Sequence, residues 1–252
     1  MKKIIFYLIT VLVFLPTFVV ATDVDKIDDD AIYKNFEVKT DNGMEYSVKC
    51  HGTRESDISM FNVQNDNYNF AVRDIADYYE SIDYEKYSVE KIKNGFAILY
   101  DKAEKIKFIY DLGKKVWTIT LNGKNSTSKY SVEFSLIESN DNTLFNDARK
   151  WGVYGSSNNK KIFSDMKVAY NNEKYYDVPL SAYSDMVDMR SYYLYPITDG
   201  FGLIIEGSNT AENYTANFTF KKGLLMRKEI RNGEFYGDVW EQIFYSYNEL
   251  EN

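Results

Sequence analysis

Two stretches of this chain, 105 residues apart, carry nearly the same pattern of side chains. Residues 94–100 read NGFAILY and residues 199–205 read DGFGLII. Each stretch starts with a dipeptide that supplies the positive φ of a tight hairpin turn, and large apolar residues follow at alternate positions. The sequence therefore predicts, at both places, a hairpin turn followed by a buried strand.

The similarity extends well beyond these two stretches. Residues 46–100 align with residues 151–205 without a gap, and ten of the 55 aligned pairs are identical. Five extra residues at 207–211 then change the offset to 110, which aligns Phe108 with Phe218. This pattern predicts that one folded unit occurs twice by internal duplication. The alternative is a simple antiparallel meander, which repeats its turn signals every 8–12 residues.

In each copy, one segment has apolar residues spaced by three and four positions. This spacing is typical of the core-facing stripe of an amphipathic helix. Asn69 or Asp74 could begin the first helix, while Asp177 could cap the second and Pro179 would fall in its first turn. The apolar positions are Ile75, Tyr78 and Ile82 in the first copy, and Leu180, Tyr183 and Val187 in the second.

Runs of strands with one helix among them predict an α+β fold. We expect two tandem related units, each a mostly antiparallel sheet with one helix packed on a face. The first unit covers residues 36–138 and the second covers residues 148–252, and the polar linker 139–147 joins them.

Further turn signals complete this outline. Strands are expected at Phe36–Thr40 and Met44–Cys50, where they would form an N-terminal hairpin without a partner in the second copy. The dipeptides Asn122-Gly123 and Asn232-Gly233 predict additional hairpin turns.

The N-terminus predicts export. Lys2 and Lys3 precede the apolar run Ile4–Val20, and small residues before Ala21 suit a cleavage site, which is the order of a secretory signal peptide. We expect cleavage after Ala21, an acidic linker over 22–35, and a secreted or periplasmic protein. A retained membrane anchor is the alternative, although 17 apolar residues are few for a span that needs about 20.

Charge and composition argue against a nucleic-acid partner, a later membrane span and an internal disulfide. The chain has 38 acidic and 30 basic side chains. Phosphate backbones are bound by clustered Lys and Arg, so a nucleic-acid partner is not expected. No segment after the N-terminal one is long and apolar enough to cross a membrane, and a single cysteine cannot form an internal disulfide.

The sequence lacks recognisable catalytic, metal or cofactor motifs. Cys50 and the only histidine, His51, are adjacent, but neighbours on a strand point to opposite faces and cannot act as a dyad. We expect Cys50 to pack as a small hydrophobe and His51 to open the polar loop that follows. The stretch Asp23–Asp28 begins as a calcium-binding loop does but lacks the required glycine. No catalytic residue, metal ligand or cofactor is therefore predicted, and the ligand-binding residues are unknown.

Two functions from different classes fit these observations. The first is an exported, non-catalytic binding or interaction protein of unknown ligand or protein partner, with a groove between its two units. The second is a carboxylate-based hydrolase of envelope or environmental polysaccharide, for which Glu234–Glu241 mixes acids with aromatics. A purely structural envelope component cannot be separated from the first by sequence. Aromatic side chains that could provide stacking faces are Trp117, Trp151, Trp240, Tyr175, Tyr176, Tyr192 and Tyr193.

Overall fold

The structure is a computed structural model in which most of the chain is arranged as β-strands. Residues 1–31 and 140–150 lie outside the described part, and with them the predicted signal peptide, the stretch Asp23–Asp28 and most of both predicted linkers. The structure describes residues 32–51, 58–65, 69–75, 83, 86–125, 127–139, 151–152, 160–171, 173–208 and 213–247.

The strands form two sheets, which we call sheet A and sheet B. Sheet A has the order β1 (Ile32–Lys39), β2 (Glu45–His51), β3 (Ile58–Gln64), β4 (Asn69–Ile75), β12 (Met189–Ile197), β13 (Gly200–Gly207), β14 (Tyr214–Lys221), β15 (Leu224–Asn232) and β16 (Val239–Phe244). Sheet B has the order β11 (Tyr176–Asp177), β10 (Lys160–Tyr170), β9 (Lys129–Ser139), β8 (Val116–Lys124), β7 (Ala103–Asp111), β6 (Gly95–Tyr100) and β5 (Tyr87–Ile92).

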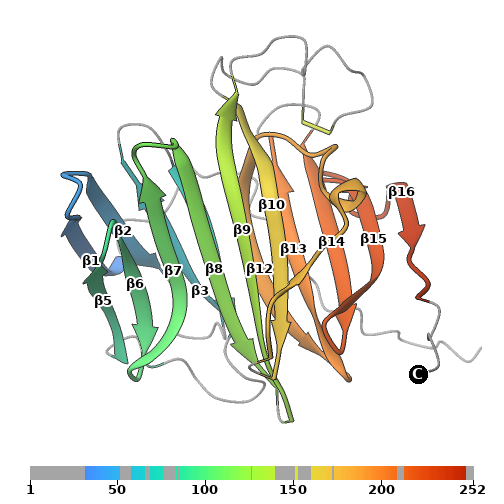
Figure 1. Cartoon of the computed structure of the whole chain (residues 1–252), viewed down its shortest axis with the longest axis horizontal. Helices are drawn as coiled ribbons and strands as arrows, with labels where there is room; N and C mark the ends of the chain where they lie inside the picture. The colour runs from blue at the N-terminus through green and yellow to red at the C-terminus, as the bar shows by residue number, and fades with distance from the viewer. Residues whose placement is uncertain are drawn as a thin grey trace, which may run out of the picture.

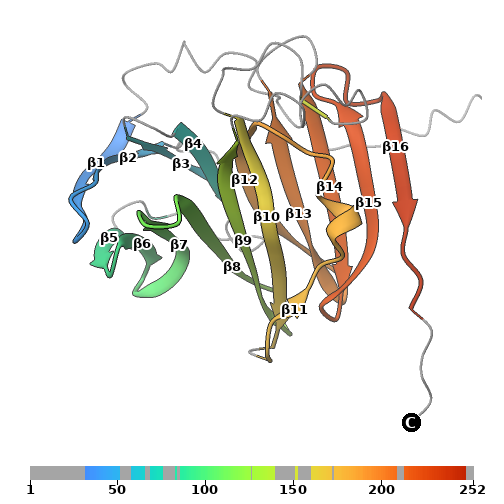
Figure 2. The same cartoon turned by 45° about the horizontal axis from the view of Figure 1, so that its top comes forward.

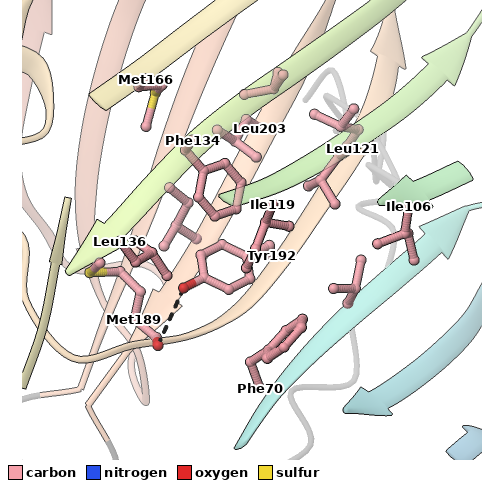
Figure 3. Close-up of a cluster of buried hydrophobic side chains, with 14 of the residues drawn as sticks. Phe70, Ile106, Ile119, Leu121, Phe134, Leu136, Met166, Met189, Tyr192 and Leu203 are labelled. Atoms are coloured by element: carbon pink, nitrogen blue, oxygen red, sulfur yellow. Dashed lines mark hydrogen bonds between the residues drawn. The ribbon is translucent and has the colours of Figure 1, made fainter. Parts of the chain in front are cut away.

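The two sheets pack face to face on one shared apolar layer. Their strands overlap in Figure 1, and in the turned view of Figure 2 β1–β4 of sheet A separate from β5–β7 of sheet B. Tyr192 of sheet A lies 4.7 Å from Phe134 of sheet B between ring centroids, and its hydroxyl donates to the Met189 carbonyl (Figure 3). Phe70 of sheet A stacks on Phe108 of sheet B at 5.2 Å. The inward-facing residues therefore form a sandwich core.

The predicted α+β class is wrong, because the described residues contain no α-helix and most of them lie in β-strands. In the second copy only a 3₁₀ turn forms, at Leu180–Ala182. Tyr183 and Val187 are buried as their spacing suggested, whereas Leu180 is exposed. From Val187 onward the backbone bonds to other segments of the chain. Val187 N–H donates to the Trp151 carbonyl, and Asp188 N–H donates to the Lys161 carbonyl.

The first predicted helix also fails at its start. Asn69 and Asp74, either of which was expected to begin it, lie in β4, which pairs with β3 over its whole length. Residues 76–82 are outside the described part of the chain. The apolar spacing thus identified two buried side chains of the second copy, Tyr183 and Val187, but it did not determine the backbone conformation.

The predicted hairpins after residues 92 and 197 are confirmed. β5 pairs with β6 across a turn in which Asn94 has φ 58°, and β12 pairs with β13 across a turn in which Asp199 has φ 61°. The N-terminal hairpin of β1 and β2 also forms, with Gly43 at φ 82°. The turn expected at Asn122-Gly123 is wrong, because both residues lie in β8 and pair with β9.

Strands from both predicted units pair with each other in both sheets. β9 and β10 are antiparallel neighbours in sheet B, and β4 and β12 are parallel neighbours in sheet A. The meander β5–β9 faces the meander β12–β16 across the core. Phe108 pairs with Phe96 in sheet B, and Phe220 pairs with Phe201 in sheet A. Strand pairing therefore aligns Phe108 with Phe220, whereas the sequence aligned it with Phe218. The duplication and its unit boundaries stay predictions.

The glycine of each repeated turn allows a close approach between strands. A Cβ atom on Gly95 would lie 1.8 Å from the Phe108 carbonyl oxygen, and one on Gly200 would lie 1.9 Å from the Phe220 carbonyl oxygen. Since both obstacles are backbone atoms in a sheet, they cannot move without breaking strand pairing.

We expect Gly95→Ala to destabilise the protein by about 1–3 kcal/mol or more, because the sheet must deform to admit the methyl group. Chemical denaturation followed by circular dichroism measures this. Gly237→Ala is the matched control, since a Cβ there meets nothing within 4 Å. Equal stabilities of the two variants would contradict the prediction.

Candidate functional site

An open groove of about 530 Å³ lies at one end of sheet B. Figure 1 shows the strand ends beside it, where β8 ends, β9 begins and β10 ends. We call it the end groove. Its volume is within the range of about 300–1,000 Å³ typical of ligand sites. Most of its lining comes from the first predicted unit, and Ala169, Glu173 and Tyr175 come from the second. Its lining residues are Ala103, Glu104, Lys105, Asn122, Gly123, Lys124, Lys129, Tyr130, Ser131, Ala169, Glu173 and Tyr175.

Strand pairing explains why polar side chains meet in this groove. Asn122 pairs with Ser131, and Ser131 pairs in turn with Ala169 across three neighbouring strands. Asn122 and Ser131 alternate with the buried Leu121 and Val132. Because side chains alternate across a strand, Asn122 and Ser131 face away from the core. A row of small and polar side chains therefore forms the floor of the groove.

Tyr175 forms the aromatic wall of the end groove. Its ring is 41% exposed, and its hydroxyl lies 2.9 Å from the Ser131 hydroxyl, which sets its orientation. The preceding chain is held to β9, since Asn171 N–H donates to the Lys129 carbonyl and Lys129 N–H donates to the Asn171 side chain. Tyr175 therefore presents an apolar face on a backbone anchored to the sheet.

Charged groups of both signs surround this aromatic ring. Lys105, Lys124 and Lys129 supply donors, and Glu104 and Glu173 supply acceptors. The Asn122 amide donates to Glu104 Oε1 at 3.3 Å, and the Tyr176 hydroxyl donates to Glu173 Oε2 at 3.3 Å. The groove thus offers an exposed ring together with many hydrogen-bonding groups, an arrangement that suits a ligand rich in hydroxyl groups.

A second polar cluster lies at the other side of the molecule, between β15 and β16. We call it the Lys228 cluster; it comprises Asp185, Lys228 and Glu241. The Lys228 side chain is 0% exposed and occupies a core position of β15, beside Phe218. Its ammonium donates to Asp185 Oδ2 at 2.5 Å and lies 2.9 Å from Glu241 Oε1. Two part-exposed carboxylates therefore neutralise one buried cation.

Two tryptophans from distant parts of the sequence meet next to this cluster. Trp151 stacks on Trp240 with ring centroids 5.5 Å apart. The backbone N–H of Trp151 donates to the backbone carbonyl of Asp185. Trp240 directly precedes Glu241 in β16. The segment Glu234–Glu241, which the sequence suggested as a sugar site, therefore contributes one stacked ring and one carboxylate here.

Burial raises the pKa of Asp185, and the opposite charge of Lys228 offsets part of this effect. Glu241 raises it further as a like charge. A proton-donating carboxyl in a hydrolase also needs a raised pKa. Here, however, both carboxylates contact the same ammonium, which indicates a structural ion cluster.

The other aromatic candidates are mostly core residues. Trp117 is buried against Tyr110 at 4.6 Å, and Tyr192 lies in the layer between the sheets. Tyr193 is also buried. Only Tyr175, Tyr176 and Trp240 of the aromatic candidates keep a well-exposed ring.

Cys50 and His51 both lie at the end of β2 and are buried. The prediction that Cys50 packs in the core is confirmed, but the expectation that His51 begins the polar loop is wrong, since His51 is the last residue of β2 and its side chain is nearly inaccessible. Both His51 ring nitrogens lack a hydrogen-bond partner within the described structure. The loop residues that follow are outside the described part of the chain.

Within the described ranges, no three His, Cys, Asp or Glu side chains are grouped so that they could hold a metal ion. The same residues contain no helix of the length and apolarity that a membrane crossing requires. Comparisons of the chain with protein-family models, with curated proteins and with solved structures give no match.

Lys228→Met should lower the free energy of unfolding by about 3–5 kcal/mol, because Asp185 and Glu241 would then repel each other without a cation. Urea denaturation at neutral pH measures this loss. Lys167→Met is the matched control, since the 2.5 Å ion pair of Lys167 with Asp165 is part-exposed and should contribute below about 1 kcal/mol. Similar losses in both variants would show that the Lys228 cluster is not structural.

The stability of the protein should fall as the pH falls below 6.5, partly because of His51. Burial lowers the pKa of His51 below 6.5, and the nearby charge of Lys49 lowers it further. As the pH falls below 6.5, the unfolded chain therefore binds a proton at His51 more readily than the folded protein does, which favours unfolding. We expect the melting temperature of His51→Gln to decrease less between pH 7 and pH 5 than that of the parent protein. The carboxylates titrate in both proteins, so they do not contribute to the difference between them. Parallel curves of melting temperature against pH would refute this role of His51.

Proposed function

We propose that the chain is an exported, non-catalytic binding protein, and that the end groove binds a hydroxyl-rich ligand such as an oligosaccharide. The observation that carries this proposal is the exposed ring of Tyr175, held beside donors and acceptors of both charges. A sugar ring has apolar C–H faces and a rim of hydroxyl groups. An aromatic face can pack on the first while polar side chains bond to the second.

The shape of the groove favours an extended ligand over a small enclosed one. The groove is open to solvent and runs across β7, β8, β9 and the chain after β10. Its floor is built on paired strands, so binding requires little rearrangement of the backbone. Residues of both halves line the groove, since Ala169, Glu173 and Tyr175 come from the second.

The carboxylate-based hydrolase stays the alternative function, and Glu104 and Glu173 are the acids that it would use. Both line the end groove. A hydrolase would release reducing ends from the bound saccharide, and Glu104→Gln or Glu173→Gln would abolish the release. A binding protein leaves the saccharide intact.

We expect Tyr175→Ala to weaken saccharide binding by about tenfold, which corresponds to the loss of one aromatic contact. A glycan array of neutral and acidic oligosaccharides identifies the ligand, and isothermal calorimetry measures its affinity. Tyr247→Ala is the matched control, because Tyr247 is similarly exposed but does not line the groove. Absence of binding on the array, or equal effects of both variants, would refute the proposal.

A further inference from the structure

The Lys228 cluster brings an amine and two carboxyl groups together in an apolar part of the molecule. Lys228 pairs with Phe218 of β14 on one side and with Ile243 of β16 on the other. Its side chain is 0% exposed, so its amino group has no access to bulk water. Lys228 Nζ lies 2.5 Å from Asp185 Oδ2 and 2.9 Å from Glu241 Oε1. An amine held this close to two acids can react with one of them as well as pair with it.

The contact between Lys228 and Asp185 suits a reaction between the two groups. Oδ2 is bonded to Cγ, so a nitrogen 2.5 Å from Oδ2 lies close to the separation of about 3–3.5 Å at which an attacking atom reaches its target. The other oxygen, Asp185 Oδ1, is buried and lacks a hydrogen-bond partner within the described structure. An unpartnered buried oxygen is more costly in a charged carboxylate than in a neutral acid. Burial also raises the pKa of Asp185, which favours the neutral acid.

We propose that Lys228 and Asp185 condense to an intramolecular amide bond, and that Glu241 transfers the proton in this reaction. A bond forms between Lys228 Nζ and Asp185 Cγ, and the bond between Cγ and one carboxyl oxygen breaks. One molecule of water leaves, and no group is oxidised or reduced. The three side chains supply every atom that the reaction needs.

Each proton in this reaction has a donor and an acceptor within the cluster. A transfer from the Lys228 ammonium to the Asp185 carboxylate gives a neutral amine and a neutral acid, which apolar surroundings favour over separate charges. The amine attacks Cγ while the Glu241 carboxylate accepts a proton from the nitrogen. Glu241 then returns this proton to the departing hydroxyl group, which leaves as water. Glu241 is thereby restored as a carboxylate beside the N–H of the new amide.

A hydrogen-bond donor lies near the reacting carboxyl group. The Tyr245 N–H donates to the Met226 carbonyl and so continues the pairing of β16 with β15. Tyr245 therefore lies on the same face as Glu241, four residues earlier. Its hydroxyl is buried and has no hydrogen-bond partner among the described residues. Burial raises the pKa of Tyr245, and the nearby charges of Asp185 and Glu241 raise it further. This hydroxyl can stabilise the negative charge that the attack moves onto an Asp185 oxygen.

The amide bond connects two parts of the chain that are distant in the sequence. Asp185 lies between the 3₁₀ turn and β12, and Lys228 lies in β15, so the closed loop contains β12, β13 and β14. Closing a loop covalently restricts the unfolded chain and thereby stabilises the fold. The chain has a single cysteine, which cannot form an internal disulfide. The amide supplies a covalent link that reducing agents do not cleave.

The first test is mass spectrometry of the purified, denatured protein. The amide lowers the mass by about 18 Da, one water molecule, relative to the chain from its measured N-terminus. Trypsin should then release peptide 175–190, which contains Asp185, still joined to peptide 228–231, because it no longer cleaves after the modified Lys228. This test needs no substitution. A parent protein with its full mass and with separate tryptic peptides would overturn the proposal.

The second test assigns the roles of the side chains. Lys228→Arg keeps the charge but should show the full mass of its sequence. Lys161→Arg is the matched control, since Lys161 is also buried and lies 2.6 Å from Glu138 Oε1, and it should retain the amide. Glu241→Gln cannot accept the proton and should form the amide about a hundredfold more slowly.

The fraction of amide-linked protein is measured by mass at successive times after cell-free synthesis, and circular dichroism confirms that each variant is folded. An amide that persists in Lys228→Arg would overturn the proposal. Equal loss of the amide in Lys161→Arg, or formation at the parent rate in Glu241→Gln, would overturn it as well.

Discussion

The aromatic layer between the two sheets is the interaction on which the rest of the structure depends. Tyr192 contacts Phe134 and Phe70, and Phe70 stacks in turn on Phe108, so rings from both sheets alternate through the core. Each buried ring removes a large apolar area from water. Neither sheet covers its own apolar face, so each sheet can be stable only when it packs on the other.

This shared core also explains why the halves of the chain are interleaved. The meander of the first half forms most of sheet B, and the meander of the second half forms most of sheet A. Each sheet is then extended by strands of the other half, through β9 with β10 and through β4 with β12. Because the backbone bonds of both sheets cross between halves, the end groove is lined from both halves and rests on continuous strands.

The two sides of the sandwich end in different ways. At one side β1 and β5 cover each other, and the apolar core reaches the edge through part-buried residues such as Val38 and Val89. At the other side a lysine occupies a core position, and two part-exposed carboxylates compensate for its burial. The buried charge is tolerated there because its partners retain contact with water. The same side carries the exposed apolar residues of β15, β16 and the turn between them.

The candidate site could be predicted only in part. Tyr175 was one of seven aromatic side chains that the sequence offered as stacking faces, and alternation with buried residues would place Asn122 and Ser131 on the outer face. The dipeptide Asn122-Gly123 is typical of a hairpin turn, however, whereas both residues remain in β8. Gly123 pairs with Tyr130, whose ring occupies the space that a side chain at Gly123 would need. With the turn misplaced, the pairing of Asn122 with Ser131 could not be foreseen, and that pairing forms the groove floor.

The sequence by itself determined the hairpin turns at Asn94 and Asp199 and the inward-facing residues of the strands that flank them, because positive φ and a period of two are local properties. Only the tertiary structure decided the fate of the segment around Leu180–Val187. Its apolar spacing is that of a helix, but the backbone groups of Asp185 and Val187 bond to Trp151, and the N–H of Asp188 bonds to the Lys161 carbonyl. Hydrogen bonds between residues distant in sequence are not encoded in local periodicity, and here they outweighed it.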